Sequence, residues 1–368
     1  MRDKFAGWYP KKATEIEALW ENAIFVPDAN VLLHCLRHAE PVRTELIRLM
    51  GLLKESLWIP YQIGLEFHRN RLDVELAALD AYDALIKDQE AAIAKARDRL
   101  SQVRAHPTIS VAKELAALDM FVSDFKARME VARAQHPSSE IERAVERLTE
   151  ILSGRVGGKW KPDQLAALKK EGDDRYIKKI PPGYKDNKKD ETEFGKYGDL
   201  IIWKDMITKA RAEKRPIIFV TDDVKEDWWW ISRGRRRGPR PELIEEFRAE
   251  SEQEFHIYEF GQFLRFAAER FPVMREKAAE VQESVLADEQ ARRRLQAAET
   301  AERNAMTRRL EDERDQIIAI LSGTPTVASA SVADRVSLRS RLDEINLEIT
   351  RLAELNDPRL SEGENQLE

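Results

Sequence analysis

Short apolar runs of strand length alternate with longer helical patterns in the first 271 residues of the chain. The runs are rich in β-branched and aromatic residues, as strands usually are. They lie at 23–27, 57–60, 216–221 and 255–260. Amphipathic helical patterns, such as those at 41–54 and 199–213, separate them. Strands that alternate with helices indicate βαβ units, so the sequence predicts an α/β fold with a mainly parallel sheet.

A heptad repeat of apolar residues interrupts this α/β pattern and predicts a long amphipathic helix. Its members are Leu72, Leu79, Ile86, Ile93 and Leu100. The segment HPTIS breaks the repeat, and two more helical patterns follow, the second behind the helix-start signal PSS. We therefore expect residues 71–153 to form an antiparallel helical arm inserted into an α/β domain that spans 1–271.

The composition changes after Phe271, the last phenylalanine of the chain. Residues 272–368 are rich in Ala, Glu, Arg and Leu, which predicts a helical hairpin or coiled coil. An apolar seam with alternating spacings of four and three runs through Leu338, Leu342, Ile345, Ile349 and Leu352. The seam fits docking within the chain as well as self-association. We expect a homo-oligomer or a protein partner bound through the helical regions.

Charged residues make up 35% of the 368 residues, and such a fraction is best accommodated on the solvated faces of long helices. The only cysteine is Cys35, and the six histidines show no zinc-ligand spacing, which indicates a reducing compartment. No apolar run is long enough to span a bilayer, so we expect a cytoplasmic protein without membrane contact. The net charge of −6 does not indicate nucleic-acid binding, but a global sum can hide a local basic patch.

Acidic residues lie where the predicted strands end, which is where an open parallel sheet binds its ligands. Asp28 follows the first strand, and Glu66 lies about two turns into the helix after the second. Asp222 and Asp223 follow the run at 216–221, and Asp199 opens the helix before that run. Alone, each acid could be a helix cap or a turn residue. Four segments that place acids at one end of the sheet favour a cluster.

Converging carboxylates repel one another, and a divalent cation relieves that repulsion. Oxygen ligands without His or Cys favour Mg²⁺ or Mn²⁺ over zinc. Such a metal can activate water for attack on a phosphodiester. The sequence therefore predicts metal-dependent hydrolysis of phosphodiesters, and we interpret Asp205 and Asp227 as structural.

Five motifs in a fixed order carry a resemblance to a known family. They are DANVLLH, IPYQIGLEFHRNR, PPGYKD, YGDLIIWKDM and IIFVTDDVKEDWW. In this order they resemble the PIN-like nuclease domains of bacteria, specifically the branch with a long helical insertion between the second and third acidic motifs. The resemblance covers roughly residues 20–271. It implies a Rossmann-like three-layer fold and a nuclease that cuts RNA or DNA. The resemblance suggests a toxin or anti-phage defence effector, with a processing or decay enzyme as the alternative.

The resemblance also implies roles for individual residues. The metal-binding and catalytic quartet would be Asp28, Glu66, Asp199 and Asp222, with Asp223 able to share the last role. Asn30 would position Asp28 or a metal-bound water, and Thr221 matches the hydroxyl residue before the last acid. The helical regions would regulate or oligomerise the enzyme.

Two basic loops flank the acidic residues and are expected to contact nucleic-acid phosphates. Their cationic residues are Lys185, Lys188, Lys189, Arg233, Arg235, Arg236, Arg237 and Arg240. Three tryptophans, Trp228–Trp230, precede the second loop and could stack on bases. For Trp228 and Trp229 we favour a place in the hydrophobic core.

Two other functions fit parts of the sequence. A haloacid-dehalogenase-like phosphatase would use Asp28 as a covalent nucleophile, but that chemistry needs a second acid two residues later, where this chain has Asn30. A non-enzymatic helical adaptor on an α/β platform is the main alternative, and its function would survive neutralisation of the acids.

Overall fold

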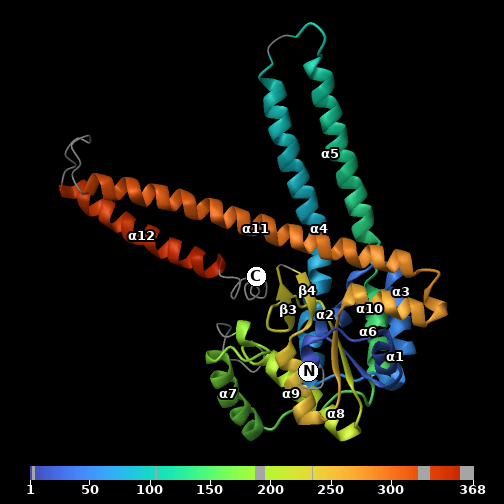
Figure 1. The fold of residues 1–368 in the computed structure, drawn as a ribbon. Coiled ribbons are helices and arrows are strands. Elements are labelled where there is room, and N and C mark those ends of the chain that lie inside the picture. Colours follow the sequence, from blue (N-terminus) through green and yellow to red (C-terminus); the bar gives the residue numbers. More distant parts are fainter. Residues whose placement is uncertain (2–4, 104–105, 187–194, 234, 322–331, 357–368) are drawn as a thin grey trace.

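The computed structural model describes residues 1, 5–103, 106–186, 195–233, 235–321 and 332–356. They form an α/β body from which two pairs of long helices project (Figure 1). The predicted fold class is confirmed: a small parallel sheet, a long helical insertion and C-terminal helices are all present.

The central sheet has three parallel strands in the order β1-β2-β5. They are β1 (Ile24–Pro27), β2 (Ile217–Thr221) and β5 (Phe255–Glu259). The predicted strand at 57–60 is reduced to isolated parallel bridges, Phe25 with Leu57 and Ile59 with Val156, which continue the sheet beyond β1. All residues of β1 and β2 are buried, because helices cover both faces of the sheet.

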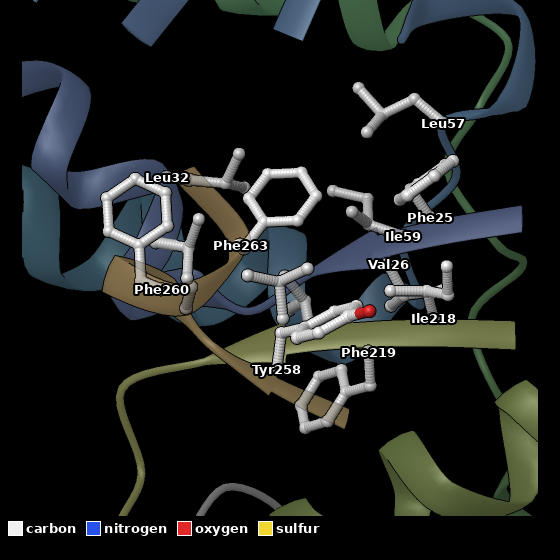
Figure 2. Close-up of a cluster of buried hydrophobic side chains, with 14 of the residues drawn as sticks. Phe25, Val26, Leu32, Leu57, Ile59, Ile218, Phe219, Tyr258, Phe260 and Phe263 are labelled. Carbon is white, nitrogen blue, oxygen red and sulfur yellow. The ribbon is translucent and has the colours of Figure 1, made fainter. Parts of the chain in front are cut away.

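Most of the helices surround this sheet. They are α1 (Ala13–Asn22), α2 (Ala29–Arg37), α3 (Val42–Leu52), α6 (Ser138–Leu152), α7 (Pro162–Ile177), α8 (Gly198–Glu213), α9 (Pro241–Ser251) and α10 (Phe260–Arg270). An antiparallel hairpin of β3 (Trp229–Ser232) and β4 (Arg235–Pro239) follows β2. Figure 2 shows part of the core, where Phe25, Val26 and Ile218 from the strands lie near Phe263 of α10.

The projecting arm consists of α4 (Tyr61–Ser101) and α5 (Val111–Ala134), which run side by side (Figure 1). The first turns of α4 belong to the body, where Ile63 and Phe67 are buried. The helix α6 was expected in the arm but lies in the body. Its apolar face, including Ala144 and Leu148, is buried in the main core, whereas α5 has no buried residue.

The C-terminal helices α11 (Ala278–Leu321) and α12 (Val332–Asn356) form a pair. The predicted apolar seam of α12 packs against α11 around Leu310 and Ile317, with Ile345 fully buried. The seam is therefore covered within the chain. The first turns of α11 join the main core through Val281 and Val285. Within the described residues, no helix is long and apolar enough to cross a membrane.

Candidate active site

The predicted acids lie at the edge of the sheet where β1 and β2 end. Asp28 caps the N-terminus of α2, and its carboxylate accepts a hydrogen bond from the backbone N–H of Ala29 at 2.7 Å. The backbone N–H of Asp28 donates to the carbonyl oxygen of Val220 at 2.9 Å, which ties this cap to the end of β2. Because parallel strands end at one edge, Asp28 and the loop after Thr221 become neighbours.

Asn30 and Thr221 hold the carboxylate of Asp28 in place. The Thr221 hydroxyl donates to Asp28 Oδ2 at 2.6 Å, and Asn30 Nδ2 donates to the same oxygen at 2.7 Å. Thr221 Oγ1 also accepts the backbone N–H of Asp223 at 2.9 Å, while Asn30 Oδ1 accepts that of Asp222 at 3.1 Å. The two neutral residues therefore connect Asp28 with Asp222 and Asp223.

The carboxylate of Asp222 points to a residue that the sequence prediction omitted. Its Oδ2 lies 2.5 Å from Nε2 of His34, a buried residue on α2. His34 stands at the end of the motif DANVLLH, so its position in that motif was the only available signal. Its ring stacks on Phe260 with 4.8 Å between the ring centroids, which fixes its orientation.

Glu66 and Asp199 approach the cluster from α4 and α8. Asp199 lies in the first turn of α8 and accepts a hydrogen bond from Trp228 Nε1 at 3.3 Å. Glu66 accepts one from Gln62 at 2.8 Å. Its carboxylate lies against Gly198, where an added Cβ would come within 3.2 Å of Glu66 Oε1. The glycine before Asp199 thus leaves room for Glu66.

A lysine and a further acid, neither of them in the prediction, complete the cluster. Lys225 Nζ lies 3.1 Å from Asp186 and 3.2 Å from Asp223. Asp186 comes from the motif PPGYKD, where it looked like one charge in a basic loop. Asp227 is fully buried and accepts the backbone N–H groups of Gly183 and Lys185, at 3.0 and 3.2 Å. These two hydrogen bonds anchor the loop to Asp227, whose burial differs from the solvated position that its structural interpretation assumed.

Burial and mutual repulsion perturb these carboxyl groups. Burial raises the pKa of Asp28 from 3.8 to about 6, and the charges of Asp223 and Asp222 add to the increase. Burial raises the pKa of Asp199 well above its usual value, which Lys225 opposes and the neighbouring acids reinforce. These carboxyl groups therefore lie within electrostatic range of one another. Asp205 lies apart from them and accepts a hydrogen bond from Trp160 at 2.7 Å.

The donor set suits a divalent cation of the Mg²⁺ or Mn²⁺ type, because it consists of carboxylate oxygens whose mutual repulsion a cation would relieve. Among the described residues, however, no group of three or more His, Cys, Asp or Glu side chains is arranged to hold a metal ion. The carboxylates are turned toward protein partners: Asp28 to Thr221, Asp222 to His34 and Asp223 to Lys225. The ammonium group of Lys225 is the positive charge between Asp186 and Asp223.

Two tryptophans at the start of the β3-β4 hairpin form hydrogen bonds with residues of this cluster. Trp228 and Trp229 are both buried, as we favoured. Trp228 donates to Asp199, and Trp229 Nε1 donates to the carbonyl oxygen of Asp223 at 2.6 Å. The base of the hairpin therefore adjoins the acids.

The predicted cationic residues that the structure describes divide into two groups. Arg233, Arg235 and Arg237 are exposed on the hairpin. The others make ion pairs within the chain: Arg236 with Glu259, Arg240 with Glu242 and Lys185 with Glu226. Lys188 and Lys189 lie outside the described residues.

Comparisons with known proteins give one match. A family model described as a PIN-like domain matches residues 24–243, which is more than half of the chain and includes every acid of the cluster. No curated protein and no solved structure matches the chain.

The raised pKa of Asp28 makes the stability of the protein depend on pH. Since its pKa is about 6 in the folded chain and near 3.8 in the unfolded chain, the stability gained from the neutral carboxyl is present below pH 4 and is lost as the pH rises through 6. Asparagine cannot ionise. We expect the free energy of unfolding of Asp28→Asn, minus that of the wild type, to increase by about 2 kcal/mol between pH 4 and pH 8.

Urea unfolding at both pH values, with a chelator present, measures this difference. Asp124→Asn is the control, because Asp124 is an exposed acid on the arm. A difference for Asp28→Asn that stays constant with pH would contradict the account of the site.

Proposed function

The chain belongs to the PIN-like domain family, and on that premise we propose that it is a metal-dependent nuclease that hydrolyses phosphodiester bonds of RNA or DNA. The observation that carries the proposal is the acidic cluster at the C-terminal edge of the sheet. There Asp28, Asp222 and Asp223 form hydrogen bonds with the same two residues, Asn30 and Thr221. Surplus buried negative charge at a ligand-binding edge is the expected arrangement for binding a cation.

The ligands of Mg²⁺ or Mn²⁺ would come from Asp28, Glu66, Asp199, Asp222 and Asp223. When bound, the cation supplies positive charge and activates water for attack on phosphorus. The chain itself orients the carboxylates. Thr221 and Asn30 fix one oxygen of Asp28, and the indole of Trp228 fixes one oxygen of Asp199. Lys225 offsets part of the negative charge of the cluster through its contacts with Asp186 and Asp223.

The substrate would reach the acids along the β3-β4 hairpin. Its strand β4 alternates, so that Arg235 and Arg237 are exposed while Arg236 turns inward over the ring of Trp229. With Arg233 at the turn, the hairpin presents three arginines to solvent. Arginine side chains bind phosphate groups well, so this face is suited to a nucleic-acid backbone.

The projecting helices are proposed to regulate the nuclease or to bind a partner, as in a toxin or an anti-phage defence effector. The seam of α12 is covered by α11, so a surface for self-association would come from the arm instead. There Leu76, Met120 and Phe121 are exposed.

Cleavage of labelled RNA and DNA in Mg²⁺ or Mn²⁺ tests the proposed activity. We expect the wild type to cleave at least one polymer, EDTA to stop the reaction, and Asp28→Asn to slow it by at least about 100-fold. That figure is the upper end of what the loss of an outer-shell partner costs a metal site. Asp124→Asn should cleave like the wild type. The proposal fails if neither polymer is cleaved, or if Asp28→Asn cleaves normally.

Binding of a single-stranded oligonucleotide tests the role of the hairpin. We expect replacement of Arg233, Arg235 and Arg237 by alanine to weaken binding and to reduce the slope of log K against log salt by about 2, because each phosphate contact contributes about 0.7. The matched control replaces Arg48, Arg143 and Arg147, which lie on α3 and α6 and pair with glutamates. Equal effects of the two triple variants would show that the hairpin has no special role.

A further inference from the structure

A continuous row of hydrogen bonds links the acidic cluster to the first turns of α11. Asp222 Oδ2 lies 2.5 Å from His34 Nε2, and His34 Nδ1 lies 3.0 Å from His38 Nε2. His38 Nδ1 in turn lies 3.0 Å from Oγ of Ser284 on α11. The proposed catalytic roles include none of His34, His38 and Ser284, and Ser284 lies outside the residues that the family model matches.

The direction of each bond in this row follows from the carboxylate. An ionised carboxylate only accepts, so Nε2 of His34 must donate to Asp222. When both rings are neutral, Nδ1 of His34 accepts a hydrogen bond from Nε2–H of His38, and Nδ1 of His38 accepts a hydrogen bond from the hydroxyl group of Ser284. Loss of the Ser284 hydroxyl therefore removes the hydrogen bond to Nδ1 of His38. This change alters the hydrogen bonding of His38 and, through it, that of His34.

The two histidines at the centre of the row are buried. His34 is fully buried and His38 nearly so. Their rings lie almost parallel with 5.2 Å between the centroids, and the ring of Phe260 stacks on that of His34 with 4.8 Å between the centroids. Buried polar networks of this kind are strongly oriented, because a displaced member loses its partner without gaining water.

The position of Ser284 depends on the docking of α11. Val281 and Val285, which flank Ser284 on that helix, are both buried in the main core. In Figure 1, α11 runs from α10 across the body before it pairs with α12. If its first turns leave the core, the hydroxyl leaves His38.

We propose that His34 is a positioning residue for Asp222, and that the docked start of α11 sets its orientation through Ser284 and His38. The C-terminal helices are thereby coupled to the acidic site. The role of Asp222 in this inference rests on the proposed nuclease function, whereas the coupling of Ser284 to His34 does not.

Long-range ¹H–¹⁵N spectra of the histidine side chains test the coupling directly, because the chain has only six histidines. His34→Gln and His38→Gln assign the two resonances. In Ser284→Ala we expect the ring nitrogens of His38 and of His34 to shift, whereas in Ser123→Ala, which removes an exposed hydroxyl on α5, neither should shift. An unchanged His34 in Ser284→Ala overturns the proposal, whether or not the protein cleaves nucleic acid.

Kinetics then test the positioning of Asp222. We expect His34→Ala to lower kcat by about 10- to 100-fold and to raise the half-saturating Mn²⁺ concentration, with KM for nucleic acid unchanged. His34→Gln, whose amide can donate to Asp222, should recover part of the loss. Ser284→Ala should lower kcat by about 2- to 10-fold, as expected for one lost hydrogen bond.

Two results distinguish a failure of the proposed nuclease function from a failure of the proposed positioning role of His34. A wild-type protein that cleaves neither polymer would refute the nuclease function, and the histidine spectra would then decide the coupling alone. A wild type that cleaves, together with a His34→Ala variant whose kcat and Mn²⁺ requirement are unchanged, would refute the positioning role while leaving the nuclease function intact.

Discussion

Repulsion between buried carboxylates is the constraint on which the rest of this site depends. The parallel sheet brings Asp28 and the loop after β2 to one edge, and α8 adds Asp199. Burial removes the water that would otherwise screen these charges, so the carboxyl groups resist ionisation. Burial is the main cause of the raised pKa values of Asp28 and Asp199, and the charges of the neighbouring acids add to the increase. A fold that keeps such a cluster must supply positive charge, hydrogen-bond donors or both.

The surrounding structure provides both. Thr221, Asn30 and the indole groups of two tryptophans donate to the cluster, and Lys225 contributes an ammonium group. These partners also decide where other parts of the molecule lie. The tryptophans place the arginine-bearing hairpin beside the acids, and His34 connects Asp222 with the C-terminal helices. Charge balance at one edge of the sheet thus connects the position of the hairpin with the contact to the C-terminal helices.

Much of the fold could be predicted from the sequence, because the deciding signals are local. The run at 216–221 became β2 almost residue for residue, since a fully buried strand is continuously apolar. The acids could be found because the ends of parallel strands share one edge. The place of α6 could not be predicted, because an amphipathic helix has the same pattern whether it covers a body or extends an arm.

The partners of the acids were hidden for a different reason. His34 and Asp222 are 188 residues apart, and only the packing of α2 against the loop after β2 brings them together. Lys225 and Asp186 look like ordinary surface charges in the sequence. Similarly, Arg236 differs from Arg235 and Arg237 only in the face of β4 on which it lies. Long-range packing and strand register decide these contacts, and neither can be derived from local spacing.

A crystal structure of the protein grown with Mn²⁺, with anomalous scattering recorded at the manganese absorption edge, tests the central claim most directly. The account predicts an anomalous peak among the carboxylates of Asp28, Asp199, Asp222 and Asp223, with the ammonium group of Lys225 moved away from Asp223. A structure without a peak there, in which Lys225 still bridges Asp186 and Asp223, would contradict the claim that this edge of the sheet is a cation site.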